Sequence, residues 1–335
     1  MDIKLLKRLG NIDQLAGIRQ YKSEQGLRML EVYNAVGLRF SLVADRALDL
    51  YDFSYKGTNF SFHTKNGLNA GRNYTPLGAE FFHYWSAGML TTCGLSSVGA
   101  GCSDESGTHP IHGRIGQTPA SNIAAASYWE GNDYIMKVSA DTEDTRLYGR
   151  HLKLSRTLTT SLFSKKLVLV DELTNMGCKD EEFAILYHFN FGHPMLSEKS
   201  RLFSTPLDVR QTAGTPAELE IIEAPTDDGG EQMYINRALT EQCTAGIINN
   251  DLRLGLSIEF DTKHLPMLHV WKHFKSHDYV LGIEPCNCYC MGRTAERDNG
   301  SLPVLPAYES IRYQITLTIA DEEKELYHLQ QKARM

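Results

Sequence analysis

Two polar side chains stand out in the segment AILYHFNFGHPML (184–196), which is otherwise rich in aromatic and aliphatic residues. His188 and Asn190 are two positions apart, so on a strand both side chains point to the same face of the sheet. Polar groups in such an apolar setting need partners. Two interpretations are open at this point: a hydrogen-bonded core histidine, or a catalytic acid supported by a neighbouring amide.

A single carboxylate interrupts a second apolar run, YVLGIEPCNCYCMGR (279–293). Glu284 follows residues of strong strand character and precedes a proline. A buried carboxylate is costly unless it is paired or functional, and partial burial would raise its pKa toward that of a useful base at neutral pH. The alternative is an edge-strand glutamate in water, which the flanking Val280, Leu281 and Ile283 disfavour.

Two turn-like segments supply further candidate ligand contacts. In THPIHGRIGQTPA (108–120), His112 and Arg114 flank a glycine that allows a ligand to approach closely, although a solvated loop histidine is the alternative. Asp45 and Arg46 lie at the end of a hydrophobic strand, where they form either a structural ion pair or substrate contacts. We treat all four as candidate substrate-binding residues.

A run of cysteines follows Glu284 and raises the question of a metal site. Cys286, Cys288 and Cys290 share one face if the strand continues, but they lack the Cys-x₂-Cys spacing that is typical of zinc sites. Buried thiols are therefore the preferred interpretation.

A histidine series offers a second possible metal site. His269, His273 and His277 would align three ligands on a helix, whereas the β-rich flanks favour a strand. We predict no metal site and keep a metal-dependent isomerase or lyase, using these residues or His188 with His193, as a minor alternative. A dinucleotide fingerprint, a phosphate-binding loop and a Gly-x-Ser-x-Gly elbow are absent from the sequence, so we predict no cofactor.

Strand signals dominate the elements that must position these residues. Alternating or β-branched apolar runs, separated by short polar, glycine or proline punctuation, predict strands at 38–44, 152–160, 166–175, 252–260 and 311–320. A series of amphipathic helices does not separate them, which argues against a parallel α/β sheet. The tail, 321–335, predicts either a surface helix or a frayed end, with acids early and bases late.

Length, composition and charge narrow the classes of function that remain possible. The 335 residues are 42% hydrophobic, 22% charged and carry a formal net charge of −7, which argues against broad binding to nucleic acid or an anionic membrane. Seven scattered cysteines and the lack of a signal peptide favour reduced thiols and a cytoplasmic location. Because a linker is not evident, we predict one domain over residues 1–335, with a homodimer as the candidate assembly.

Taken in order, the segments ADRALDL, GMLTTCGL, HPIHGRIGQTPA, LYHFNFGHPML, LPMLHVWKHF and YVLGIEPCNCYCMGR resemble the galactose mutarotase-like superfamily. The similarity is greatest to the branch named aldose 1-epimerase family protein, and it extends over nearly the whole chain. The resemblance implies an all-β, mainly antiparallel β-supersandwich with few short helices and a sugar site on its concave face.

The resemblance also implies roles for individual residues. It matches His188 to the general acid, Glu284 to the general base and His112 to a second, substrate-binding histidine. Further pocket residues implied for this branch are Arg46, Asn190, Trp271, Lys272 and Arg293. The sequence departs from the branch at Ala47, where glycine is common. It also offers no clear match to the acid that many mutarotases place between their two catalytic residues, which leaves the sugar's identity open.

The function expected from these observations is cofactor-free interconversion of the α and β anomers of an aldose or aldose derivative, an isomerase reaction. Glu284 would act as base and His188 as acid while the sugar ring opens and recloses. A sugar phosphate or uronic acid becomes the expected substrate if Arg46, Arg114 or Arg293 lines the pocket. The main alternative is a sugar-binding or regulatory module without turnover.

Overall fold

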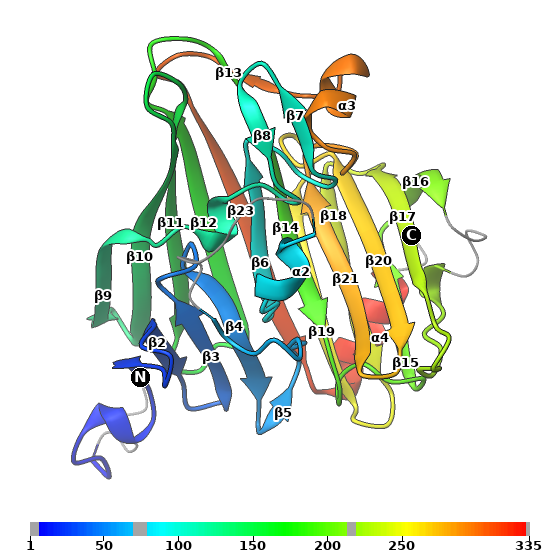
Figure 1. The fold of residues 1–335 in the computed structure, drawn as a ribbon. Coiled ribbons are helices and arrows are strands. Elements are labelled where there is room, and N and C mark those ends of the chain that lie inside the picture. Colours follow the sequence, from blue (N-terminus) through cyan, green and yellow to red (C-terminus); the bar gives the residue numbers. More distant parts are fainter. Residues whose placement is uncertain (1–6, 70–78, 213–218, 333–335) are drawn as a thin grey trace.

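The protein is described by a computed structural model that covers residues 7–69, 79–212 and 219–332. Antiparallel β-sheets account for most of its regular structure, and the helices are few and short (Figure 1). The expected all-β, mainly antiparallel fold class is therefore confirmed. Among the described residues, no helix combines the length and apolar character needed to cross a bilayer.

Three large sheets form the body of the molecule. The five-stranded sheet contains, in spatial order, β1 (Gly17–Lys22), β2 (Arg28–Tyr33), β3 (Leu38–Val43), β4 (Asp49–Tyr55) and β5 (Thr58–Asn59). The eight-stranded sheet contains β15 (Ser200–Ser204), β18 (Gln242–Asn249), β19 (Leu254–Asp261), β23 (Ser310–Ala320), β12 (Lys166–Asn175), β11 (His151–Ser161), β10 (Asp133–Thr145) and β9 (Ser121–Glu130). The six-stranded sheet contains β16 (Leu207–Thr212), β17 (Glu231–Ala238), β20 (Met267–Lys275), β21 (Asp278–Cys286), β14 (Ala184–Phe191) and β6 (Leu90–Leu95).

Shorter elements complete the chain. Two small sheets pair β7 (Cys102–Asp104) with β8 (Gly107–His109) and β13 (Glu181–Glu182) with β22 (Val304–Leu305). The helical segments are η1 (Ile12–Gln14), α2 (Phe81–Tyr84), η3 (Ile115–Gln117), α3 (Arg293–Asp298) and α4 (Glu323–Lys332).

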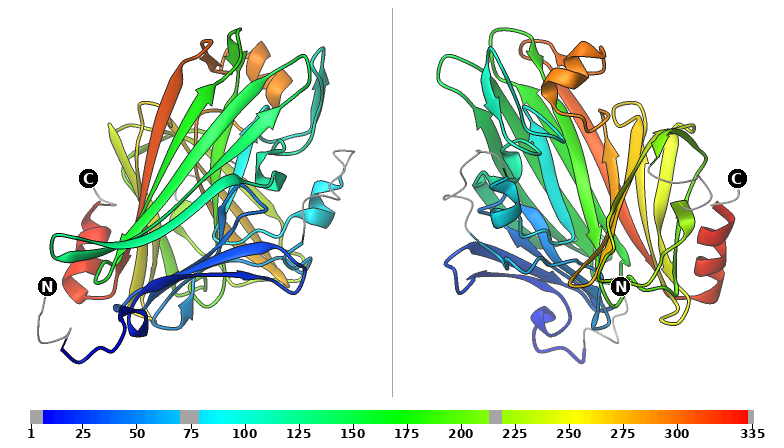
Figure 2. Two further views of the ribbon diagram at one scale, coloured as in Figure 1. Left: turned by 90° about the vertical axis from the view of Figure 1, so that its left-hand side faces the viewer. Right: turned by 45° about the vertical axis from the view of Figure 1, so that its right-hand side comes forward.

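The main hydrophobic core is built from buried side chains of all three large sheets, whose arrangement is shown in Figure 2. Burial alternates strictly along β11, as expected for a strand with one face on the core. Strand β14 is buried along its whole length instead. Its odd-numbered side chains, such as Tyr187 and Phe189, join the main core, so His188 and Asn190 occupy the opposite face.

The predicted strands correspond to β3, β11, β12, β19 and β23. The tail forms α4, whose Leu326 and Leu329 pack against Phe203 and Ile248; residues 333–335 of the expected 321–335 helix lie outside the described residues.

His269 and His273 of the histidine series lie on strand β20, as the flanks indicated, rather than on a helix, and His277 lies in the turn before β21. Strand β21 ends at Cys286, so the condition for Cys286, Cys288 and Cys290 to share a strand face is not met. All seven cysteines lie in the described part of the chain and are free.

Candidate active site

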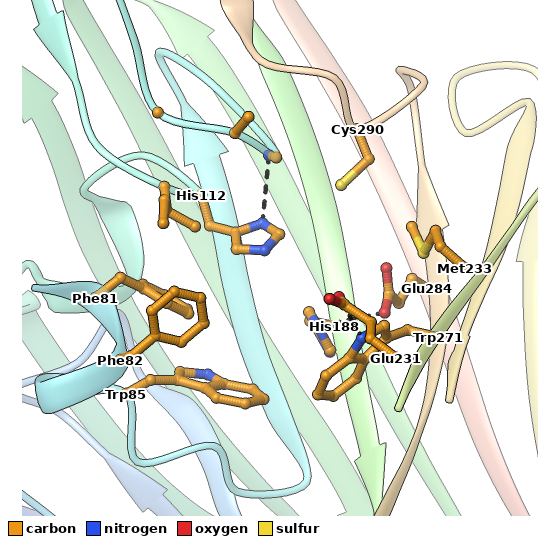
Figure 3. Close-up of a pocket in the computed structure, with 14 residues that line it drawn as sticks. Phe81, Phe82, Trp85, His112, His188, Glu231, Met233, Trp271, Glu284 and Cys290 are labelled. Carbon is orange, nitrogen blue, oxygen red and sulfur yellow. Dashed lines mark hydrogen bonds and ion pairs between the residues drawn. The ribbon is translucent and has the colours of Figure 1, made fainter. Parts of the chain in front are cut away.

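A cavity of about 330 Å³ lies over the face of the six-stranded sheet that carries His188 (Figure 3). Strands β14, β17, β20 and β21 provide one wall, and α2 with the loops around residues 99–101 and 111–112 provides the other. The lining residues are Phe81, Phe82, Trp85, Gly99, Ala100, Gly101, Ile111, His112, His188, Glu231, Met233, Trp271, Glu284 and Cys290.

Strand register brings the two candidate catalytic residues together. Strands β14 and β21 are antiparallel neighbours, and Leu186 pairs with Cys286 while Asn190 pairs with Gly282. His188 and Glu284 lie between these two pairs, and both side chains point to the cavity. His188 Nε2 is 3.3 Å from Glu284 Oε1, although residues 188 and 284 are far apart in sequence.

Glu284 is held in an environment that disfavours its charge. Its exposed fraction is only 1%, and burial raises its pKa to about 8, with the nearby negative charge of Glu231 as a second cause. Oε1 has no hydrogen-bond partner among the described residues. At neutral pH the carboxyl of the free protein therefore holds its proton.

His188 is also buried, and burial disfavours its charged form as well. Burial lowers its pKa well below the usual range, and neighbouring His112 lowers it further. Its ring packs against two tryptophans, with centroids 5.5 Å from Trp85 and 5.4 Å from Trp271. Both members of the pair are thus neutral in the free site, and together they hold one exchangeable proton.

Gly282 makes the close approach of these groups possible. A Cβ atom at this position would lie 2.5 Å from Glu284 Oε1 and 3.2 Å from His188 Cε1. Any other residue would therefore displace the carboxylate or the imidazole.

His112 completes the polar side of the cavity. The Gly99 backbone N–H donates to His112 Nδ1 at 3.4 Å, so the proton of the neutral ring is on Nε2. Burial lowers the pKa of this histidine to about 4, which keeps the ring neutral at physiological pH. The ring lies 5.8 Å from His188, centroid to centroid, and can donate a hydrogen bond into the cavity.

Backbone contacts fix the loop that carries His112. Gly94 of β6 donates to the carbonyl of His112 at 2.9 Å and accepts from Arg114 N–H at 2.9 Å. Gly113 has a φ of +70°, and a Cβ there would lie 2.1 Å from the Gly94 carbonyl oxygen. Glycine at this position therefore permits the contact between the loop and the strand.

Aromatic side chains form the apolar walls. Trp85 and Trp271 lie 5.9 Å apart at their ring centroids, and Phe81 stacks on Trp85. The Trp85 indole N–H donates to Thr91 Oγ1, which fixes the orientation of that ring. Such rings suit the apolar faces of a sugar.

Glu231 is a cavity residue that the sequence analysis missed. It is the first residue of β17 and directly follows the polar loop DDGG, where a glutamate is expected to be an ordinary solvent-exposed side chain. Strand pairing places β17 beside β20, and the Trp271 indole N–H donates to Glu231 Oε1 at 2.7 Å. A pattern within one segment could not reveal this cross-strand contact.

Two of the expected substrate-binding residues support the cavity wall without lining it. Arg46 is buried, and its Nη1 donates to Ser86 Oγ at 3.0 Å and to the carbonyl oxygen of Tyr84 at 3.2 Å, next to α2. Asn190 donates to the carbonyl oxygens of Gly88 and His188. Both side chains hold the backbone around the site.

Four more of the expected substrate-binding residues lie away from the cavity and have other partners. Lys272 follows Trp271 on β20 and so faces the core side of the sheet, where its Nζ donates to Ile221 O at 2.8 Å. Asp45 accepts from Arg28.

Arg293 begins α3 and forms ion pairs with Asp104 and Glu182, at 3.1 and 2.8 Å. Arg114 donates to the Thr108 carbonyl and lines a second cavity. Of the expected site residues, the structure therefore brings Glu284, His188, His112 and Trp271 to the first cavity.

Two of the histidines considered as metal ligands have backbone partners. His269 Nε2 contacts the Cys288 carbonyl at 2.8 Å, and His273 Nδ1 contacts the Asp278 carbonyl at 3.0 Å. Among the described residues, a group of three or more ligands suited to a metal ion does not occur.

The sequence of the chain shows which protein family it belongs to. Residues 24–319 match the family described as domain of unknown function (DUF4432). The chain belongs to the DUF4432 family. A search of curated proteins found no match.

Solved structures share the fold of this DUF4432 protein. A Klebsiella pneumoniae protein, provisionally assigned as an aldose 1-epimerase, aligns with a TM-score of 0.86 and 23% identity over 95% of this chain and 86% of its own. A galactose mutarotase-like protein from Clostridium acetobutylicum aligns with a TM-score of 0.67 and 12% identity over 92% of this chain and 100% of its own. The expected galactose mutarotase-like sandwich is therefore confirmed for this DUF4432 protein.

Proposed function

We propose that this protein is an aldose 1-epimerase, or mutarotase, that interconverts the α and β anomers of an aldose. The observation that carries the proposal is the His188–Glu284 pair, with 3.3 Å between Nε2 and Oε1, inside a cavity with aromatic walls. The mutarotase-like fold is consistent with it.

The pair suits the bond changes of anomer exchange. A base removes the proton of the anomeric hydroxyl, the bond between C1 and the ring oxygen breaks, and an acid protonates that ring oxygen. The open aldehyde rotates about C1–C2 and the ring recloses on the other face of the carbonyl. Both oxygens are bonded to C1, so the acid and the base must be close neighbours, as His188 and Glu284 are.

One shared proton is sufficient for both directions. When His188 holds the proton, Glu284 is the base and His188 the acid; when Glu284 holds it, the roles are exchanged. Because burial disfavours the charge on each group, the free protein favours the neutral form with the proton on Glu284, and the form with the proton on His188 is higher in energy. The forward and reverse steps of the reaction use the same two groups in exchanged roles.

The lining favours a neutral sugar. Among the described residues, those that line the cavity include Glu231 and Glu284 but neither lysine nor arginine. Arg46, Arg114 and Arg293, which would have favoured a sugar phosphate or uronic acid, lie elsewhere. His112 Nε2–H and the Glu231 carboxylate supply a donor and an acceptor for sugar hydroxyls.

The test follows a freshly dissolved pure anomer by polarimetry or NMR over a panel of aldoses. We expect Glu284→Gln and His188→Asn each to lower kcat by about 10²–10⁴-fold, because each removes one proton-transfer group. The exposed Glu130→Gln on β9 is the matched control and should retain the wild-type rate. Wild-type rates no better than those of the variants on every sugar would contradict the proposal.

A binding module without turnover gives a different result. Sugars would then raise the Tm equally in the wild type and in Glu284→Gln, without any rate enhancement by either protein. The combined rate and Tm measurements therefore separate the two functions.

A further inference from the structure

A second cavity, of about 390 Å³, lies beside the β7–β8 hairpin near the top of Figure 1. It is lined by Ser96 directly after β6, by the hairpin, by Arg114, and by the end of β10 with the turn that leads to β11. We propose that this cavity binds a small oxyanion that also carries a hydroxyl group: hydrogen phosphate or the phosphate group of a monoester.

Four buried residues that line this cavity carry polar atoms without hydrogen-bond partners. The atoms are Ser96 Oγ, His109 Nδ1, Asp144 Oδ2 and Arg150 Nη1, none of which has a hydrogen-bond partner among the described residues. The four residues are only 2, 3, 8 and 8% exposed, respectively. Burying such atoms without partners is costly, so their convergence points to a polar ligand.

The arginines that line the cavity favour an anionic ligand. Among the described residues, Arg114, Arg146 and Arg150 line the cavity together with a single acidic residue, Asp144. Arginine is well suited to oxyanions because its planar guanidinium presents several donors in a fixed geometry. The exposed Arg146 lies at the rim, and its Nη1 is 4.0 Å from the position a Cβ would take at Gly107.

Neighbouring acids face the same groups but have partners of their own. Asp104 Oδ1 accepts from His109 Nε2 at 3.0 Å, while its Oδ2 accepts from Arg293 and Arg297. Glu181 Oε1 lies 4.0 Å from Arg150 Nε, which leaves Nη1 of that arginine for a ligand.

Two acceptors in the cavity require a ligand with protons to donate. His109 donates through Nε2 to Asp104, and burial lowers its pKa, so the neutral ring presents Nδ1 as an acceptor. Asp144 Oδ2 is the second acceptor. Hydrogen phosphate or a protonated monoester supplies an O–H, whereas sulfate carries no proton near neutral pH. The cavity should therefore prefer phosphate to sulfate.

This cavity is distinct from the candidate active site. The two share no lining residue, although the same loops contribute to both. Gly99 and His112 line the first cavity, whereas Ser96, His109 and Arg114 line the second. The inference does not depend on the proposed mutarotase reaction.

The test is calorimetric titration of the full chain at constant ionic strength. The probes are inorganic phosphate, glycerol phosphate as a monoester, sulfate and glucose. We expect saturable binding of phosphate or the monoester, with sulfate at least about tenfold weaker. Stronger binding of glycerol phosphate than of inorganic phosphate would assign the site to a monoester, and the reverse result to free phosphate.

Variants locate the binding. Arg146→Gln should raise the phosphate Kd about tenfold, because it removes a charge-assisted contact. Asp144→Asn should reduce the preference for phosphate over sulfate, since the amide can donate to sulfate and no longer repels it. The exposed Arg312→Gln on β23 removes the same charge far from the cavity and should leave the Kd unchanged, as should Glu284→Gln.

Arg150→Gln should weaken binding further, and circular dichroism checks that it folds. If it does not fold, the test of phosphate binding rests on Arg146→Gln and Asp144→Asn. The proposal is overturned if no probe binds saturably, or if both of these variants bind phosphate and sulfate as the wild type does.

Discussion

At the scale of single residues, burial sets the protonation of the site. Glu284 and His188 would both be charged near neutral pH only at a high desolvation cost, so the pair carries one proton and no net charge. In the proposed reaction, the same environment would limit the pH range in which the pair can transfer a proton.

The pH profile of kcat/KM follows from these two pKa shifts. Above about pH 8 the pair loses its single proton, so kcat/KM should fall about tenfold per pH unit. On the acid side, His188 gains a second proton only well below its usual pKa, so activity should stay level down to mildly acidic pH. Initial rates of anomer exchange across pH 5–10, corrected for the buffer reaction, provide the measurement.

The variant Glu231→Gln tests the cause of this pH profile. The variant removes the negative charge that helps to raise the pKa of Glu284, so the alkaline fall should move to lower pH. Activity that instead increases through pH 8 would mean that the ionised carboxylate of the free protein is required, contrary to the shared-proton scheme.

At the scale of elements, close backbone contacts hold loops against strands around the site. The His112 loop is bound to β6 through reciprocal hydrogen bonds with Gly94, and Gly113 permits that approach. The position of the His112 imidazole is therefore determined by backbone packing rather than by its own side-chain contacts alone.

Gly113→Ala should disturb this contact. Its Cβ would overlap the Gly94 carbonyl, and its φ of +70° is unfavourable for alanine, so we expect a loss of about 3 kcal/mol or more of unfolding free energy and a raised KM. Gly131 has a similar φ of +58° but open space around it, so Gly131→Ala should lose only about 1–2 kcal/mol and retain its KM. Urea unfolding and steady-state kinetics measure both effects; equal losses in the two variants would contradict the role of the contact.

At the scale of the whole molecule, a buried ion network joins the three large sheets. Arg156 of β11 donates to Asp171 of β12 and to Asp49 of β4, at 2.7 Å in each case. It also donates to Thr92 of β6, and Tyr187 of β14 donates to Asp171. Tyr187 and Thr92 lie next to His188 and Thr91 in sequence, so the network supports the sheet behind the candidate site.

Arg156→Met should reveal whether the sheets unfold as one unit. Leaving Asp49 and Asp171 buried without their counter-charge should cost about 3–5 kcal/mol. Arg39→Met, which removes an arginine from an exposed ion pair, should cost less than about 1 kcal/mol. We expect one cooperative transition by circular dichroism and fluorescence, shifted as a whole in Arg156→Met; two transitions, only one of them shifted, would contradict the prediction of a single domain over 1–335.

The homodimer and the cytoplasmic location stay predictions.

Local sequence patterns were sufficient for the fold class and for the central pair. Alternating apolar residues define strands such as β11 and β12 because side chains alternate between two faces with a period of two. Polar residues within apolar strands are conspicuous for the same reason, which is why His188 and Glu284 could be selected before their proximity was known.

Only the tertiary structure decided which side chains meet. Trp271 and Lys272 are adjacent in sequence, yet one lines the cavity and the other faces the core side of the sheet. Arg293 satisfies Asp104 and Glu182, and Glu231 reaches the site across a strand pair. The sequence by itself determined the strands and the unusual polar residues within them, because those depend on neighbours along the chain. The composition of both cavities depends on register between strands that are distant in sequence, and packing of the whole molecule sets that register.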